Sequence, residues 1–374
     1  MIYFDNAATT QINNNALADL IEKSKSLFGN ASTNYSLGVA SKRVLEEARS
    51  NIAKLLSCDS KSIFFTSGGT ESNNIIIQSF FRNYSSLENI HIICSSIEHK
   101  SILKVLECMT NKNIKISYVL PNANGIITPE SVRKEINQNT KLICVQYINN
   151  ELGTVQPINE IAKIAKGYNI LIHVDAVQAV GHVNIDINKL GIDSLSASAH
   201  KFGGPKGIGF LYSNNKNIGL CFGGGQEQNV KSGTENVPAI SSMSVALSEA
   251  LLDIEDKQKY ITSLINYLKN SLSKIKYVKL NVDNKDYTSM LNFRITGVSN
   301  EALVNYLDLH NICVATGSAC SGNSFSRSYV LRSIGMDNKA IDSSIRVSLS
   351  YLNTLEECNL FIDNLRRAIS LLKK

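Results

Sequence analysis

The chain has 374 residues, of which 43% are hydrophobic and 19% charged, a composition typical of a globular protein large enough for two domains. Its net charge of +6 is mild, and no dense block of lysine and arginine occurs, so we expect no direct contact with nucleic acid. No apolar run reaches the roughly 18 residues of a membrane span. The first residues also lack the basic and apolar regions of a signal peptide, so we expect a cytoplasmic protein without a membrane partner.

Short apolar runs alternate with helical patterns from about residue 60 to 215. A helix is predicted to open at Thr70, another is capped by Thr128 with Pro129 at its first position, and a third runs from Pro157 to about Tyr168. Nearly apolar strands separated by helices are typical of a mostly parallel sheet covered on both faces, which binds ligands beyond the carboxyl ends of its strands. The predicted strands are 63–66, 91–94, 116–120, 142–145, 170–174, 194–197 and 208–212.

The pattern changes after residue 235. One long helical stretch is predicted over roughly 237–272. Strands near 277–281 and 290–295, a helix at 300–310 and a closing helix at 354–372 follow it. We interpret this part as a second, smaller α+β domain.

The eight cysteines are scattered and form no CxxC pair. This pattern is typical of reduced thiols rather than of a disulfide framework or a zinc site, so no metal is expected. We expect most of these cysteines to be small, buried, apolar side chains.

Lys201 and Asp175 together carry the strongest chemical signal. Lys201 opens a glycine-rich loop, and Asp175 closes the apolar run 170–174. A lysine can form a Schiff base with an aldehyde, and a carboxylate can keep a ring nitrogen protonated; these are the two protein partners of pyridoxal phosphate (PLP). A single lysine is normally a solvated surface group and a strand-end aspartate a turn former, so the prediction depends on the pair.

A site for the phosphate is predicted between strand 63–66 and the helix that follows. There the free backbone N–H groups and the helix dipole favour an anion, and the Thr70 hydroxyl is a further donor. Taken alone, this segment is more typical of a tight turn with a threonine N-cap, and the GxxxxGK[ST] spacing of a P-loop is absent. Ser198 and His200 are further candidate phosphate donors, and Gln178 is a candidate donor to the ring oxygen.

The chain resembles the PLP enzymes of the class V aminotransferase fold, and among them the cysteine desulfurases of the NifS/IscS type. The resemblance covers nearly the whole chain, and its motifs occur in the family's order. The motifs are YFDNAATT at 3–10, TSGGTESN at 66–73, EHK at 98–100, NNELG at 149–153, SGT at 232–234 and SIRVS at 344–348.

The resemblance implies an α/β chain with the PLP-dependent transferase fold (fold type I, aspartate aminotransferase-like). Residues 15–250 would form the large PLP-binding domain on a mostly parallel sheet. Residues 1–14 and 251–374 would form the smaller α+β domain, which carries the catalytic cysteine. A homodimer is also implied.

The resemblance also implies roles for the residues that match the motifs. Lys201 would carry the Schiff base, and His99 would stack on the ring and help to move protons, although a histidine there could equally be a cap. Asn150 would contact the ring oxygen and the substrate carboxylate. Arg346 would bind that carboxylate through its planar fork, against the alternative of a surface salt bridge. The phosphate would be held by Gly69, Thr70, Ser198 and His200, with Thr234 reaching the cofactor of the neighbouring subunit.

Cys320 matches the family's catalytic cysteine, in a stretch of small residues, 315–323, suited to a mobile loop. Only a thiolate is a competent nucleophile, so an exposed cysteine is favoured over a buried one. The implied reaction takes L-cysteine to alanine: Lys201 or His99 moves the Cα proton, and Cys320 attacks the substrate sulfur to form a persulfide. The persulfide would then pass sulfur to an acceptor protein, for iron–sulfur cluster assembly or tRNA thiolation.

Other readings stay open from the sequence. The nearest is another PLP enzyme of this fold, a selenocysteine lyase or an aminotransferase, although Cys320 together with Arg346 favours desulfuration. A non-catalytic sulfur carrier or phosphate-binding module is a further alternative. The chain also departs from the family in the segment containing Tyr35, where a histidine is usual, and at Lys231, where an arginine is common.

Overall fold

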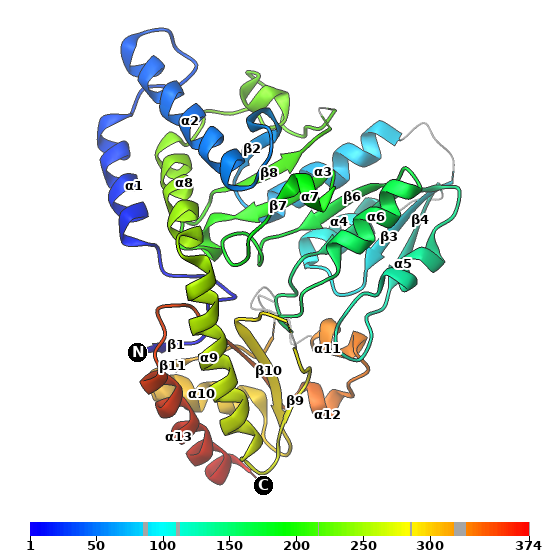
Figure 1. Ribbon diagram of the computed structural model, residues 1–374, viewed down its shortest axis with the longest axis vertical. Helices are drawn as coiled ribbons and strands as arrows, with labels where there is room; N and C mark the ends of the chain where they lie inside the picture. The colour runs from blue at the N-terminus through cyan, green and yellow to red at the C-terminus, as the bar shows by residue number, and fades with distance from the viewer. Residues whose placement is uncertain (85–88, 110–112, 216, 285, 318–326, 374) are drawn as a thin grey trace.

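The structure, a computed structural model, describes residues 1–374 except 85–88, 110–112, 216, 285, 318–326 and 374. Its centre is a seven-stranded sheet in the order β2-β8-β7-β6-β5-β3-β4 (Figure 1). Within this sheet β8 runs antiparallel to both of its neighbours, and the other pairings are parallel. The predicted mostly parallel sheet is therefore confirmed. The strands are β2 (Ile63–Thr66), β3 (Ile90–Ser95), β4 (Ile114–Val119), β5 (Thr140–Gln146), β6 (Leu171–Asp175), β7 (Ser194–Ser198) and β8 (Gly209–Ser213).

Helices cover both faces of this sheet. The 3₁₀ segments are η1 (Ser60–Ser62), η2 (Ala199–Lys201) and η3 (Gln226–Asn229). Thr128 caps α5 as predicted, because its hydroxyl accepts a hydrogen bond from the backbone N–H of Ser131. The helices are α1 (Asn14–Ser26), α2 (Ser36–Leu55), α3 (Gly69–Tyr84), α4 (Lys100–Met109), α5 (Pro129–Glu135), α6 (Ile158–Gly167), α7 (Ile187–Leu190) and α8 (Val237–Leu251).

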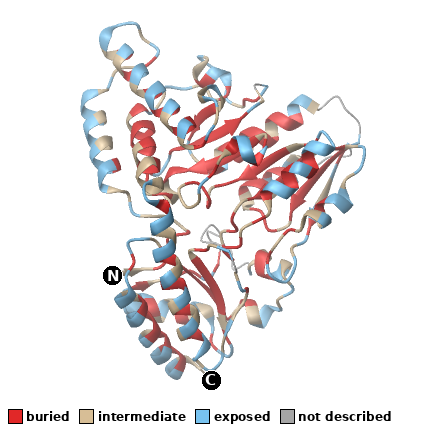
Figure 2. Cartoon of the chain, in the orientation of Figure 1, coloured by how far each residue is buried: buried red, intermediate tan, exposed pale blue. Residues whose placement is uncertain are grey.

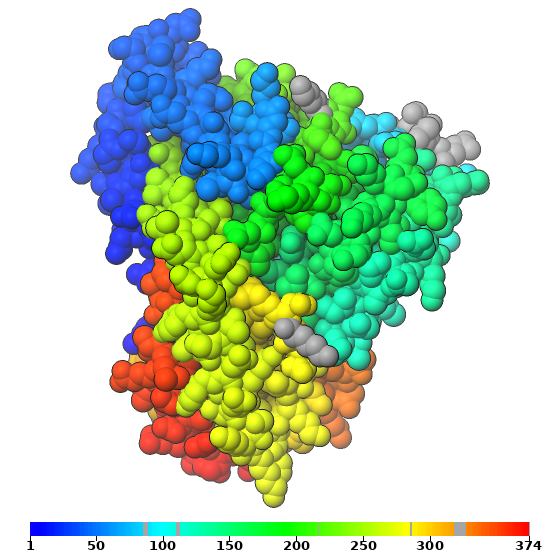
Figure 3. Space-filling model, viewed as in Figure 1, coloured from blue at the N-terminus to red at the C-terminus, as the bar shows by residue number. Residues whose placement is uncertain are grey.

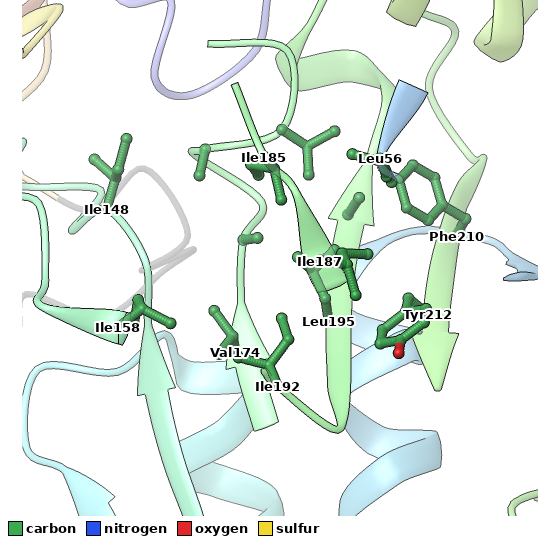
Figure 4. Close-up of a cluster of buried hydrophobic side chains, with 14 of the residues drawn as sticks. Leu56, Ile148, Ile158, Val174, Ile185, Ile187, Ile192, Leu195, Phe210 and Tyr212 are labelled. Atoms are coloured by element: carbon green, nitrogen blue, oxygen red, sulfur yellow. The ribbon is translucent and has the colours of Figure 1, made fainter. Parts of the chain in front are cut away.

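Alternation along β5 shows how the two faces are used. Ile143 and Val145 belong to the core under α5, α6 and α7, whereas Leu142 and Cys144 belong to the core under α3 and α4. Successive strand side chains point to opposite faces, so a strand buried on both faces must be apolar at nearly every position. Figure 2 shows the central strands buried along their length, and Figure 4 shows part of the first core.

The C-terminal part has its own core, built around Phe4, Phe293 and Phe361, each fully buried. The N-terminal strand β1 (Ile2–Tyr3) joins it by pairing in parallel with β11 (Ile312–Cys313). β9 (Val278–Leu280), β10 (Met290–Ile295) and β12 (Ser344–Ser348) form an antiparallel sheet in the order β12-β10-β9. The helices here are α9 (Ile254–Ser273), α10 (Asn300–Leu309), α11 (Tyr329–Ser333), α12 (Asn338–Ile341) and α13 (Leu355–Leu372).

The prediction of one helical stretch over 237–272 is wrong, because α8 and α9 are separate helices that meet at 68°. Leu252 is extended and Asp253 adopts a left-handed conformation (φ 50°), which ends α8. The break has a packing reason. α8 packs against α1 and α2 in the first core, whereas α9 packs against α13 in the C-terminal core. Figure 3 shows the two helices as one column down this face of the molecule.

Among the described residues, no single helix is long and apolar enough to cross a membrane; the bent pair α8 and α9 passes that test only when taken together.

The described cysteines are all free thiols, but fewer are buried than predicted. Cys108 is exposed on α4, and Cys221 is exposed in the segment between β8 and η3. Neither side chain belongs to a packed core, so the usual preference of cysteine for the interior did not predict their exposure. Cys94, Cys144 and Cys358 are buried, and Cys58 and Cys313 are half-buried.

Candidate active site

A cavity of about 160 Å³ brings most of the predicted site residues together at the carboxyl ends of β6 and β7. Asp175 ends β6, Ser198 ends β7, and Lys201 ends η2 directly after it. The predicted residues that line this cavity are Gly69, Thr70, His99, Asn150, Asp175, Gln178, Ser198, His200, Lys201 and Arg346.

Two predicted residues are not placed in this cavity. Thr234 is exposed and does not line it, and Cys320 lies outside the described residues. A larger cavity of about 570 Å³ also touches Lys201. Of the predicted site residues, only Lys201 lines that larger cavity, so the smaller one is the candidate active site.

The Lys201 amine is held by the N-terminal segment. Its Nζ donates hydrogen bonds to the carbonyl oxygens of Ala7 at 2.6 Å and Ala8 at 2.8 Å. Gln178 also donates from Nε2 to the Ala7 carbonyl, at 2.8 Å. The segment that begins the chain therefore forms one wall of the site, beside the amine.

The Asp175 carboxylate is buried and fixed in orientation. One oxygen accepts from the backbone N–H of Val177 at 3.0 Å, and the other accepts from Asn73 Nδ2 at 2.8 Å. A carboxylate oxygen can accept more than one hydrogen bond, so both retain acceptor capacity toward the cavity that Asp175 lines. This is the group expected to face a protonated ring nitrogen.

The beginning of α3 supplies the predicted anion site. The first N–H groups of a helix have no intrahelical partner, and the helix dipole favours negative charge there. A Cβ added to Gly69 would lie 2.4 Å from Val177 Cγ2, so this helix start can approach the neighbouring loop only because residue 69 is glycine. Gly68 is also in a conformation (φ 149°) that favours glycine.

His200 lines the same cavity as a neutral donor. Burial, with help from the positive charges of Lys201 and Lys206, lowers the pKa of His200 to about 4. At neutral pH its imidazole is therefore uncharged, with Nδ1 3.1 Å from the hydroxyl of Thr9. It can give a hydrogen bond to a phosphate, but it adds no positive charge.

Arg346 is buried at 1% exposure, so the surface salt-bridge alternative is wrong. Nη1 donates to the Asn150 carbonyl at 2.6 Å, and Nη2 donates to Asp5 Oδ1 at 2.6 Å. Its Nε is buried and has no hydrogen-bond partner in the part of the chain that the structure describes. Arg346 lines the cavity, and each of its Nη atoms carries a second N–H, so the planar guanidinium is suited to an incoming carboxylate.

Sequence reasoning missed the polar residues beneath this surface. Asp5 was part of a quoted motif but was given no role, although it pairs with Arg346. Asn73 and His173 are fully buried behind Asp175, and Ser101 lines the cavity beside His99. The signal for His173 was available, since it lies two residues before Asp175 on one strand and therefore shares its face.

These observations fit PLP. One cavity combines an amine, a fixed carboxylate, a helix start that only glycine allows and a guanidinium. Lys201, Asp175 and the start of α3 would hold the aldehyde, ring nitrogen and phosphate respectively. The fold and the site are those of a PLP-dependent enzyme.

Comparisons with known proteins identify the family of the chain. Residues 2–361 match the family Aminotransferase class-V. Cysteine desulfurase IscS of Dictyoglomus turgidum is 38% identical over 376 residues, which cover 100% of this chain and 95% of that protein. Cysteine desulfurase IscS of Buchnera aphidicola is 38% identical over 380 residues, covering 100% of this chain and 93% of that protein. A solved structure of a NifS-like protein superimposes with a TM-score of 0.93 at 31% identity, covering 99% of this chain and 100% of the other.

The chain therefore belongs to the class V aminotransferase family, and within it to the cysteine desulfurases of the NifS/IscS type. The predicted resemblance, fold and PLP cofactor are confirmed. The alternatives of an aminotransferase and a selenocysteine lyase are not favoured by these matches.

Proposed function

We propose that this enzyme takes sulfur from L-cysteine onto Cys320, releases alanine and delivers the sulfur to an acceptor protein. The observation that carries the proposal is the single cavity in which Lys201, Asp175 and Arg346 meet. The planar Arg346 guanidinium selects an amino-acid carboxylate, and the Lys201 amine and the Asp175 carboxylate fit the cofactor at the other end. The substrate is thereby oriented between the two.

Each residue has a defined task in this proposal. Bound PLP supplies an electron sink that weakens the bonds around Cα and Cβ of the amino acid joined to it. Arg346 binds the substrate carboxylate, and the Asn150 carbonyl and Asp5 hold the guanidinium in place. Lys201 Nζ or the His99 ring takes the proton from Cα and later returns a proton to the three-carbon product.

The sulfur step belongs to Cys320. Its thiolate bonds to the substrate sulfur as the Cβ–S bond breaks, and the bonding pair of the Cβ–S bond stays with the carbon fragment. Protonation of that fragment gives alanine, and the enzyme keeps a persulfide. The persulfide is then a donor of sulfur to a second protein, by attack of an acceptor thiolate on its outer sulfur.

Mass spectrometry after L-cysteine treatment tests the assignment. We expect one added sulfur on Cys320 in the wild-type protein, and alanine in the solution. Cys320→Ser should retain PLP and bind cysteine but make no protein persulfide, with Cys221→Ser as the control for an exposed thiol elsewhere. Sustained alanine release by Cys320→Ser would contradict the persulfide step.

We further propose a cytoplasmic homodimer that serves iron–sulfur cluster assembly or tRNA thiolation. Thr234 supports the dimer, because it does not line the cavity of its own chain. It is exposed, so its side chain can contact a neighbouring subunit. Phe28 and Phe222, each 79% exposed, add apolar surface suited to a contact between copies. Sedimentation at low concentration tests the oligomer, and incubation of the persulfide enzyme with candidate acceptors tests the pathway.

A further inference from the structure

A buried hydrogen-bond chain lies behind the two cofactor-facing groups Asp175 and His99. It begins at His173, whose ring is fully buried, with Nδ1 2.9 Å from Ser194 Oγ and Nε2 2.9 Å from Asn73 Oδ1. Asn73 is fully buried on α3 and reaches across to β6 and α4. None of these bonds lies on the surface, so water does not compete for them.

The orientation of the Asn73 amide follows from its partners. Asp175 Oδ2, at 2.8 Å, is a carboxylate oxygen and accepts hydrogen bonds, so the atom facing it must be the Asn73 nitrogen. The amide oxygen then faces His173 Nε2, which must donate. Burial lowers the pKa of His173 to about 3, so this ring is neutral and its Nδ1 accepts from the Ser194 hydroxyl.

The second hydrogen of the Asn73 amide continues the chain toward His99. Asn73 Nδ2 donates to Ser101 Oγ at 2.8 Å, which leaves the hydrogen of that hydroxyl free to donate elsewhere. Ser101 Oγ lies 2.8 Å from His99 Nδ1, and the Ser101 backbone N–H also donates to that nitrogen, at 3.1 Å. A backbone N–H can only donate, so His99 Nδ1 is an acceptor. The neutral His99 ring therefore carries its hydrogen on Nε2.

We propose that Asn73, oriented by His173, is a positioning residue that fixes the Asp175 carboxylate and turns the Ser101 hydroxyl toward His99, where it supports the Nε2–H tautomer that the Ser101 backbone N–H also selects. The Asn73 amide thus contacts both branches of the site. It orients Asp175, which faces the pyridine ring of the cofactor, and it reaches His99 in the same cavity through Ser101. This inference rests on the proposed function for the identity of the cofactor-facing groups. It adds Asn73 and His173, which do not line the cavity but decide how Asp175 is presented, and Ser101, which lines the cavity beside His99.

Two variants separate the branches of the chain. Asn73→Leu removes both donors, whereas Ser101→Ala removes only the hydroxyl that leads to His99. Asn83→Ala is the matched control, because Asn83 lies near the end of the same helix and donates to a backbone carbonyl, that of Asn217, on the surface.

Each variant is examined as the PLP-loaded enzyme, by the rate at which PLP dissociates and the rate of alanine formation from cysteine. Asn73→Leu should release PLP about tenfold faster, as expected for loss of a hydrogen bond to a buried charged group, and should also make alanine more slowly. Ser101→Ala should slow alanine formation about threefold or more but leave PLP release unchanged. Asn83→Ala should change neither rate.

The tautomer is measured directly in the loaded wild-type protein by ¹⁵N-histidine NMR, with the His99 signals identified by their loss in His99→Gln. A protonated Nε2 is expected, and a protonated Nδ1 would overturn the proposal even if Asn73→Leu failed to fold. Wild-type PLP release in Asn73→Leu would overturn it as well. If the loaded enzyme makes no alanine from cysteine, the desulfurase proposal fails, whereas PLP release from Asn73→Leu still decides the role of Asn73.

Discussion

Replacing Arg346 by lysine tests how the site recognises its substrate. Lysine keeps the positive charge beside Asp5 but loses the planar fork, and with it the bond to the Asn150 carbonyl and the paired donors for a carboxylate. A hydrogen bond to a charged group contributes about 1.5–3 kcal/mol, so loss of one such bond to the substrate carboxylate should raise KM for cysteine about 10- to 100-fold. Loss of the bond to Asn150 should lower stability by about 1–2 kcal/mol.

Steady-state alanine formation gives KM, and urea unfolding gives stability. Arg332→Lys, an exposed arginine on α11, is the matched control and should behave as wild type. Cysteamine, which is cysteine without the carboxylate, provides the decisive comparison: its binding to the loaded enzyme should be the same in wild type and Arg346→Lys. An equal loss for cysteamine and cysteine would refute the reasoning, since the defect would then not concern the carboxylate.

Two buried titratable groups make predictions about pH and stability. Because His173 has a folded pKa of about 3 and an ordinary unfolded value near 6.5, the unfolded chain binds the extra proton, and stability should fall as the pH drops from about 6.5 toward 3. Urea unfolding of His173→Gln should show a flatter acid dependence, by up to about 1.4 kcal/mol per pH unit; an unchanged slope would exclude the buried ring as a cause. Burial raises the pKa of Glu151, which accepts a hydrogen bond from Ser328 and has a second oxygen without a partner in the described chain. The charged form is therefore the costly one, so Glu151→Gln should raise the melting temperature at pH 8 more than at pH 5, and the reverse order would contradict this assignment.

The domain limits at 14 and 250 stay a prediction, although the structure shows where packing changes. α8 belongs to the first core and α9 to the C-terminal core, with the left-handed Asp253 between them. The sequence did not reveal this break, because both helices are apolar enough to read as one pattern. A left-handed residue other than glycine has no reliable local signal.

Local sequence determined the elements that carry the site. Most strands of the central sheet are short, largely apolar runs, and the exceptions are β4 and β7, which carry several polar residues. Apolar runs in alternation with helices have few packing solutions other than a covered, mostly parallel sheet. Because the carboxyl ends of parallel strands share one edge, Asp175 and Ser198 had to lie near each other. The glycines before α3 and the lysine after β7 could be recognised for the same reason.

Tertiary structure alone decided the partners of those residues. Asp5 and Arg346 are 341 positions apart and meet only because β1 and β12 enter the same C-terminal core, which also buries the guanidinium. Asn73 reaches Asp175 because α3 packs over the face of β6 that carries it, a contact between segments 102 residues apart. Hydrogen bonds of this kind depend on distances set by packing, which residue types and local periodicity do not encode.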